Sequence, residues 1–265
     1  MLSLSIDAAT RFSGLALLDG STLLAEYLVQ SPLSHSERLL PAIDKIFGDC
    51  ARSVSDLEAI IVSKGPGSFT GLRIAMSLAK GMAQALDIPL LGVSSLDHWA
   101  CSLAFAIAEK TPILVLLDAG RGEYYSALYI QKDGELMRLE PELPRPLDAL
   151  REIVSATNSR TSEEGQHEPN RESSGDDTAK QVRSIPKVHL TGDVFPKKRA
   201  EITAAFGDEV ILLSEHCSLP RPSALALLGQ RRFDRGERDD LFTLVPQYLR
   251  LSEAERKRLA PMTNN

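Results

Sequence analysis

Cysteine is scarce in this sequence, and nothing in its spacing suggests a disulfide or a metal site. The three cysteines, Cys50, Cys101 and Cys217, are an odd set without a C-x-x-C pair. This excludes a disulfide framework and a zinc knuckle and is typical of a protein kept in a reducing compartment. The five histidines do not form paired helical ligands either, so we predict no metal site.

Long hydrophobic runs are also missing. No stretch approaches the roughly 20 apolar residues of a membrane-spanning helix. The first residues carry no basic region and reach an acid at Asp7, unlike a signal peptide. We therefore expect a cytoplasmic protein without a membrane partner. The formal net charge of −6 also argues against a general binder of nucleic-acid phosphates.

What the sequence does contain is a glycine-rich turn between a predicted strand and a predicted helix. The apolar run 59–62 is typical of a buried strand, and Thr70 is placed to cap the helix that follows. Gly65, Gly67 and Gly71 have the spacing G-x-G-x-x-x-G, which is neither a P-loop nor a dinucleotide fingerprint. We interpret these glycines as serving a tight turn and close packing, and phosphate binding at the helix start is the alternative.

The predicted helix after this turn has two apolar faces. One contains Leu72, Ala75, Met76, Ala79 and Met82, and the other contains Ile74 and Leu78. A helix at a protein surface needs only one apolar side, so we expect a second covering by another domain or another protein. We assign the face with Ile74 and Leu78 to the chain's own core and the other face to a partner.

The sequence from residue 110 onward repeats the pattern with which the chain begins. Two matched dipeptides support the repeat at one constant offset: Asp7-Ala8 with Asp118-Ala119, and Ala16-Leu17 with Ala127-Leu128. Each half begins with a strand, an Asp turn and a second strand, which indicates an internal duplication. The order of strands and helices predicts an α/β fold with mixed sheets in two lobes, 1–109 and 110–250, before a charged tail at 251–265.

The two aspartates of the repeat are candidates for a site between the lobes. Asp7 and Asp118 each follow a buried strand, where they would hold magnesium and phosphate in a cleft. The alternative is that each carboxylate closes its turn by bonding backbone amides. Thr10, Gly65 and Gly67 complete the possible nucleotide-binding set.

The second half contains a stretch of different composition. Polar residues dominate 157–184 and apolar residues almost vanish, so we predict a mobile insertion there. A helix over 223–232, with Pro222 well placed at its start, follows the next strands. This helix is a candidate to pack back on the first lobe.

Several motifs, in order along the chain, resemble the TsaB (YeaZ) family. The most specific is 65–74, Gly-Pro-Gly-Ser-Phe-Thr-Gly-Leu-Arg-Ile, and others lie at 35–41, 92–94, 118–125 and 248–250. The resemblance implies a duplicated actin-like (ASKHA) fold. It also implies a non-catalytic subunit that dimerises with TsaD and works with a TsaE-type subunit to form threonylcarbamoyladenosine at the tRNA adenosine next to the anticodon. Contact with tRNA would come only through the complex.

The resemblance also separates this chain from TsaD, the catalytic relative. In TsaD the stretch equivalent to 93–99 carries two metal-binding histidines, where this chain has Ser95 and Trp99, and His98 is one position out of phase. A hydroxyl and an indole do not replace imidazole ligands. The family turn Asp-Thr-Ser-Thr is Asp-Ala-Ala-Thr at 7–10, which removes hydroxyls from a phosphate site. We therefore expect no catalysis and no cofactor for the chain on its own, with weak binding of ATP and magnesium as the alternative.

The partner surface is predicted on two helices. It comprises His35, Leu39, Leu40, Ile43, Phe47, Leu72, Arg73, Ala75, Met76, Ala79 and Met82. In the absence of TsaD, a homodimer through the same helices and a monomer are the two alternatives. The rival hypothesis is an enzyme, either a stand-alone ASKHA phosphotransferase or a glycoprotease-like metallopeptidase. It requires ATP between Asp7 and Asp118 or a metal near His35.

Overall fold

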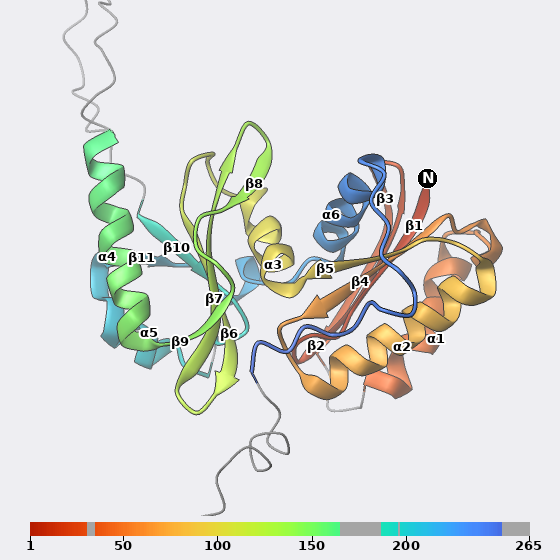
Figure 1. Cartoon of the computed structure of the whole chain (residues 1–265), viewed down its shortest axis with the longest axis horizontal. Coiled ribbons are helices and arrows are strands. Elements are labelled where there is room, and N and C mark those ends of the chain that lie inside the picture. The colour runs from red at the N-terminus through yellow and green to blue at the C-terminus, as the bar shows by residue number, and fades with distance from the viewer. Residues whose placement is uncertain (31–34, 165–186, 196, 251–265) are drawn as a thin grey trace, which may run out of the picture.

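The computed structural model describes residues 1–30, 35–164, 187–195 and 197–250, and it consists of two lobes that lie side by side (Figure 1). The first lobe is built on a five-stranded sheet with the order β3-β2-β1-β4-β5. Its elements are β1 (Leu2–Asp7), β2 (Phe12–Asp19), β3 (Thr22–Gln30), α1 (His35–Asp49), a 3-10 turn (Val54–Asp56), β4 (Ala59–Gly65), α2 (Phe69–Leu86), β5 (Leu90–Ser94) and α3 (Ser95–Ala104).

The second lobe is built on a six-stranded sheet. Five strands follow the order β11-β10-β6-β7-β8, and β9 also pairs with β7. The elements are β6 (Ile113–Gly120), β7 (Glu123–Lys132), β8 (Glu135–Arg138), β9 (Leu143–Pro146), α4 (Leu147–Glu164), β10 (Val188–Thr191), α5 (Arg199–Phe206), β11 (Val210–Leu212) and α6 (Pro222–Asp234), with 3-10 turns at Gly207–Glu209 and Glu215–Cys217. Within the described ranges, no helix combines the length and the apolar character needed to cross a bilayer.

The two sheets have the same plan. In the first, β1 pairs antiparallel with β2 and parallel with β4, and β3 and β5 extend the two sides. In the second, β6 pairs antiparallel with β7 and parallel with β10, and β8 and β11 extend the two sides. This repetition of strand order and direction confirms the predicted duplication and the predicted α/β fold with a mixed sheet in each lobe.

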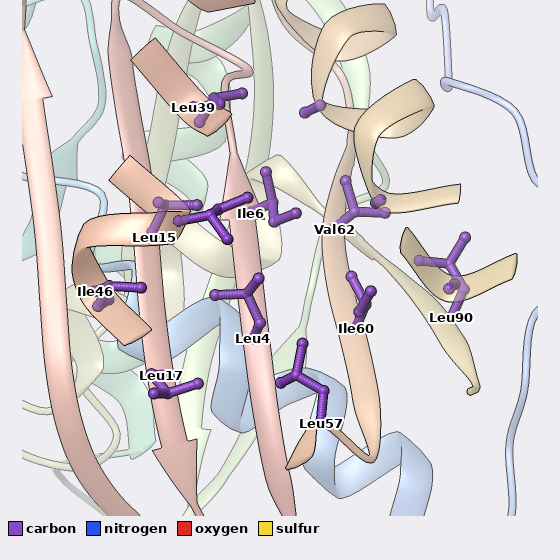
Figure 2. Packing of buried hydrophobic residues seen from close by; sticks show 14 of the residues in the cluster. Leu4, Ile6, Leu15, Leu17, Leu39, Ile46, Leu57, Ile60, Val62 and Leu90 are labelled. Carbon is purple, nitrogen blue, oxygen red and sulfur yellow. The ribbon is translucent and has the colours of Figure 1, made fainter. Parts of the chain in front are cut away.

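Both faces of the first sheet are buried along β1, whose successive side chains point to opposite faces of the sheet. Leu4 points to the side covered by α1 and α2, where it joins the main apolar core of the lobe (Figure 2). Ser3 and Ser5 point to the opposite side, toward α6. The Ser5 hydroxyl donates a hydrogen bond to the Pro222 carbonyl (2.7 Å), and the Gln230 amide donates one to Ser3 (3.0 Å). The buried hydroxyls are therefore satisfied, as burial of polar groups requires.

Each half of the chain contributes one helix to the sheet of the other half. α3 follows β5, yet its Trp99 is fully buried in a core that also contains Val115 of β6. α6 comes from the second half, yet its Ala226 packs against Leu18 of β2. Both helices consequently lie between the lobes (Figure 1). The exchange buries apolar surface from both halves and joins them.

α2 begins two residues earlier than the sequence suggests. The side chain of Ser68 caps the helix by accepting the Gly71 N–H at 3.2 Å, so the predicted cap at Thr70 is wrong. Ser68 still has a non-helical backbone (φ −58°, ψ 118°), which the capping position requires, whereas Thr70 lies inside the first turn. The helix ends at Leu86, and the left-handed backbone of the following Asp87 (φ 53°) stops it.

The predicted insertion at 157–184 is wrong in its first part. α4 continues to Glu164, so 157–164 is helical. The Asn158 side chain donates to the Glu209 carbonyl (2.8 Å), and this bond ties α4 to the neighbouring 3-10 turn. A polar helix can persist beyond its apolar contacts when side chains fix it in this way. Residues 165–184 lie outside the described residues.

Candidate functional site

The predicted division of α2 into a core face and a partner face is wrong. Ala75 and Ala79, which the sequence assigns to a partner, are 0% exposed and pack in the chain's own core. Ile74 and Leu78, assigned to the core, are only half-buried at its edge. The physical reason is size, because alanine lets the helix approach its neighbours closely while larger side chains fit beside the contact.

The same correction applies to most of the predicted interface. Its buried members are Leu39, Ile43, Phe47, Leu72, Ala75, Met76 and Ala79. Leu39 lies with Ile46 in the core between α1 and the strands (Figure 2). A side chain enclosed in the folded lobe offers no surface to a partner, so these residues support the helices rather than form an interface.

What the two helices expose is a narrow apolar edge. Leu40 of α1 is 61% exposed, and Ile74, Leu78 and Met82 of α2 are half-buried. We call these four side chains the helix edge. α1 and α2 contact each other on the side of the first sheet opposite α6 (Figure 1). Of the predicted interface, Leu40 and Met82 belong to this edge.

An aromatic cluster stands at the start of α2. The rings of Phe69 and Tyr248 lie 5.0 Å apart, and the Arg73 guanidinium lies 3.9 Å from the Phe69 ring. Arg73 also donates a hydrogen bond to the Tyr248 hydroxyl (3.0 Å). Arg73, predicted for the interface, therefore holds the C-terminal segment against α2. Phe69 was missed as a functional candidate because its partner is far away in the sequence.

The predicted cleft between the lobes exists, with a volume of about 290 Å³. Its walls include Thr10, His35 and Gly67 from the first half and Asp118 from the second. The structure therefore brings together three of the five possible nucleotide-binding residues, namely Thr10, Gly67 and Asp118. His35, predicted for the interface, faces this cleft and lies 2.6 Å from the Ser13 hydroxyl through Nδ1.

Asp7 and Gly65 do not line the cleft. Asp7 is buried, and its Oδ1 accepts hydrogen bonds from the Ala9 N–H (3.0 Å) and from the Ser63 hydroxyl. This is the turn-closing role rather than the metal-binding one. Gly65 has φ 106°, and a Cβ there would lie 2.7 Å from the Gln247 carbonyl oxygen. The C-terminal segment therefore covers Gly65.

The glycine-rich turn is packed directly against the first Asp turn. A Cβ at Gly67 would lie 2.2 Å from the Ala9 carbonyl oxygen, and one at Gly71 would lie 2.0 Å from the Ala8 carbonyl oxygen. The Ser68 N–H donates to the same Ala9 oxygen at 2.6 Å. These contacts support the packing interpretation of the glycines, because both the space and one N–H are used by the chain itself.

The second half places two carboxylates at the cleft. Asp118 Oδ1 accepts the Gly120 N–H (2.8 Å) and pairs with Lys198 (3.2 Å). The Asp118 N–H donates to Asp193, and burial raises the pKa of the Asp193 carboxyl to about 6. Asp193 was missed from the sequence, although it follows the short buried strand β10 and Asp118 lies close to the end of β6. Arg11 completes the polar wall.

The residues of α3 at which the sequence analysis expects no metal ligands are buried inside the molecule. His98, Ser95 and Trp99 are all 0% exposed on α3. His98 Nε2 bonds the Arg221 carbonyl (2.8 Å), and Nδ1 lies 3.8 Å from Asp7 Oδ2. Burial lowers the pKa of His98. In the described part of the chain, no three His, Cys, Asp or Glu side chains gather closely enough to hold a metal.

Comparison with known proteins finds relatives over nearly the whole chain. The family model of TsaD, tRNA N6-adenosine threonylcarbamoyltransferase, matches residues 30–258. The tRNA threonylcarbamoyladenosine biosynthesis protein TsaB of Bacillus subtilis (strain 168) is 36% identical over 257 residues, which make up 97% of each chain. The protein of the same name from Escherichia coli (strain K12) is 37% identical over 133 residues, covering 50% of this chain and 56% of that protein.

A solved structure extends the likeness to the fold. YeaZ from Pseudomonas aeruginosa superposes with a TM-score of 0.69 at 23% identity, covering 93% of this chain and 99% of that chain. The match to the Bacillus protein spans both lobes, with the glycine-rich turn and the helix edge inside it. The chain therefore belongs to the TsaB (YeaZ) family, related to the threonylcarbamoyltransferase TsaD.

Proposed function

We propose that this chain is a non-catalytic subunit in the biosynthesis of threonylcarbamoyladenosine in tRNA. In this role it binds a TsaD-type catalytic partner and, with a TsaE-type subunit, supports the active complex. The single observation that carries the role is the 36% identity to Bacillus subtilis TsaB over 97% of both chains. A match of that length covers both lobes of this chain.

The helix edge is the surface that we propose for the TsaD-type partner. Its four apolar side chains come from two adjacent helices of the first lobe. Apolar side chains projecting from paired helices suit packing against two helices of another subunit. The predicted helices are thus retained as the docking elements, but the contacting side chains change from Ala75 and Ala79 to Ile74 and Leu78.

The arrangement of α3 supports a role without independent catalysis. The side chains at the positions of the two TsaD histidines, Ser95 and Trp99, lie in the core, and His98 bonds a backbone carbonyl. None of the three faces the cleft. The metal chemistry would then come from the partner, whose active arrangement this chain stabilises.

The cleft favours one second candidate, a stand-alone phosphotransferase. Asp118 and Asp193 lie together at the mouth of a cavity between two actin-like lobes, where a magnesium–nucleotide complex would need carboxylates. Calorimetry of the isolated chain with ATP and magnesium decides between the candidates. Tight magnesium-dependent binding of ATP that Arg11→Ala in the cleft abolishes would favour the enzyme, and its absence would favour the subunit. The TsaB-type role requires neither nucleotide nor metal from this chain.

Association with purified TsaD tests the proposed function. We expect the wild-type chain to form a complex that is recovered by size-exclusion chromatography. Leu78→Arg should weaken that complex at least about tenfold, since a buried unpaired charge at an interface costs well over 1.4 kcal/mol. Ala200→Arg, at an exposed position on α5, is the matched control and should bind normally. Recovery of no complex with wild-type chain would overturn the proposal.

A homodimer through the same edge is the expected state when TsaD is absent. The helix edge of one chain would then pack against the helix edge of a second copy, because a two-fold symmetric dimer covers the same apolar surface on both chains. Leu78→Arg should abolish both associations. If it abolishes only the homodimer, TsaD binds elsewhere.

A further inference from the structure

A second cavity, with a volume of about 500 Å³, lies between the two lobes and shares no lining residue with the cleft at Asp118. β5 and the start of α3 form one side, β7 and β8 form another, and the C-terminal turns of α6 close it. Cavities of roughly 300–1,000 Å³ hold ligands up to the size of a drug or a nucleotide. Nothing in the proposed function uses this cavity, which we call the α6 pocket.

Two cations in the α6 pocket form no ion pair in the described part of the chain, although Lys64 lies near enough to Asp239 to lower the pKa of that carboxyl. Lys64, on β4, is half-buried and forms no ion pair there. Arg231, on α6, is half-buried and donates one hydrogen bond, to the Gly134 carbonyl at 3.2 Å. Partly desolvated cations without a counter-charge are unfavourable, and a bound anion would remove that cost.

The other charged groups in the pocket are already engaged or lie at its exposed rim. Arg138 pairs with the carboxylates of Asp97 and Glu142. Glu142 is buried, and its second oxygen accepts a hydrogen bond from Gln247 (3.2 Å). Glu135 is the remaining carboxylate of the lining and is exposed on β8. Arg232 and Arg235 also line the pocket and pair with Glu237, so Lys64 and Arg231 are the lining cations that form no ion pair among the described residues.

A buried hydroxyl without a normal hydrogen bond also belongs to this pocket. Tyr129 is 1% exposed and lines the cavity beside Asp97, and its hydroxyl oxygen makes no hydrogen bond of normal geometry. Burial raises the pKa of this phenol, so the hydroxyl keeps its proton and is available as a donor. Buried polar groups nearly always have a partner, and an unsatisfied one indicates a missing partner such as a ligand.

We propose that the α6 pocket binds a small molecule that carries a phosphate group, with Lys64 and Arg231 facing the phosphate and the Tyr129 hydroxyl donating to the ligand. A phosphomonoester carries about two negative charges at neutral pH, which matches the two unpaired cations. Arginine and lysine are the usual side-chain partners of phosphate. The enclosed volume fits a ligand of nucleoside monophosphate size rather than a polymer.

Calorimetry of the full-length chain with AMP, inorganic phosphate and adenosine tests the proposal. We expect AMP and phosphate to bind and adenosine not to bind. Arg231→Ala should weaken AMP binding about tenfold, as expected for loss of one charge-assisted hydrogen bond. Tyr129→Phe should weaken it by a similar factor without lowering the melting temperature of the free protein, because the hydroxyl has no normal hydrogen bond to lose.

Two control variants locate the bound AMP. Arg151→Ala removes an exposed cation on α4 and should change nothing. Arg11→Ala alters the cleft at Asp118 and should leave AMP affinity unchanged. If Arg11→Ala weakens binding and Arg231→Ala does not, the ligand occupies the cleft and the proposal is wrong.

Three further outcomes would overturn the inference. In the first, neither AMP nor phosphate binds. In the second, adenosine binds as tightly as AMP. In the third, an RNA oligonucleotide binds and AMP does not. The last result would assign the cations to a polymer backbone. Because the isolated chain is used, none of these results bears on its association with TsaD.

Discussion

The two halves of this chain share a sheet plan but place the same residue in opposite environments. Asp7 ends the first strand of its half, and Asp118 lies two residues before the end of the first strand of its half. Asp7 is 0% exposed, closes its own turn and lies 3.8 Å from His98. Asp118 is 44% exposed and pairs with Lys198. The duplication thus preserves the position of a carboxylate without preserving what surrounds it.

The helices that follow equivalent strands differ in the same way. α2 follows β4 and buries its alanines, leaving an apolar edge at the surface. α5 follows β10 and buries Ile202 and Phe206, with Ala200 exposed. The contrast teaches that a repeat in sequence locates backbone elements, whereas packing decides which side chains remain for a partner. Four substitutions test this difference between the halves through their effects on the stability of the folded protein.

The largest expected effect is at Ala79. Ala79→Arg puts a charge into a site that is 0% exposed between α2 and its neighbours. We expect the first lobe to unfold, with a loss above about 4 kcal/mol, because the charge is both too large and unpaired. Ala200→Arg, in the second half, should change stability by less than about 0.5 kcal/mol. Thermal unfolding followed by circular dichroism measures both, and equal melting temperatures would contradict the assignment.

A smaller loss is expected at Asp7. Asp7→Ala removes the acceptor of the Ala9 N–H and the Ser63 hydroxyl, and both groups stay buried. Two unsatisfied buried donors cost about 2–4 kcal/mol together. Urea unfolding gives the value directly. A loss below about 1 kcal/mol would show that water reaches this turn.

A substitution at Asp193 should stabilise the protein, whereas those at Ala79 and Asp7 destabilise it. Its pKa is raised from the ordinary value of 3.8 to about 6, so its charged form costs stability in the folded state. Asp193→Asn keeps an acceptor for the Asp118 N–H and should stabilise the protein by about 1–2 kcal/mol above pH 6. The gain should shrink as the pH falls from 6 toward 3.8, because the wild-type carboxyl then takes up its proton. A gain independent of pH would contradict this cause.

The smallest effect is expected at Asp118. Asp118→Ala removes an exposed ion pair with Lys198 and a bond to the Gly120 N–H that water can replace. Exposed pairs contribute about 0–1 kcal/mol, so the loss should stay below about 1 kcal/mol. The comparison with Asp7→Ala in the same urea experiment is decisive. Equal losses at the two aspartates would remove the asymmetry between the halves.

Much of the fold could be predicted from the sequence, because it depends on local patterns. The buried run at 59–62 and the repeated Asp turns locate the central strands, and their order gives the mixed sheets. The exchange of α3 and α6 between the lobes depends on contacts between distant segments. A helical pattern shows that α6 has an apolar side but not which sheet it covers.

The site was harder to predict for related reasons. Ala75 and Ile74 both mark apolar sides of α2, and the sequence cannot say which side needs small residues for close approach. Asp193 follows a strand of only four residues, which gives a weak signal. The contact of Phe69 with Tyr248 joins residues at opposite ends of the chain. Each case depends on tertiary packing rather than on local pattern.

Cross-linking to TsaD tests the central claim, that the helix edge is the partner surface, most directly. A photoreactive residue at position 78 on α2 and another at position 200 on α5 would be compared in the full-length protein. The account predicts a cross-link to TsaD from position 78 and none from position 200. A cross-link from position 200 alone would contradict it and would move the partner to the second lobe.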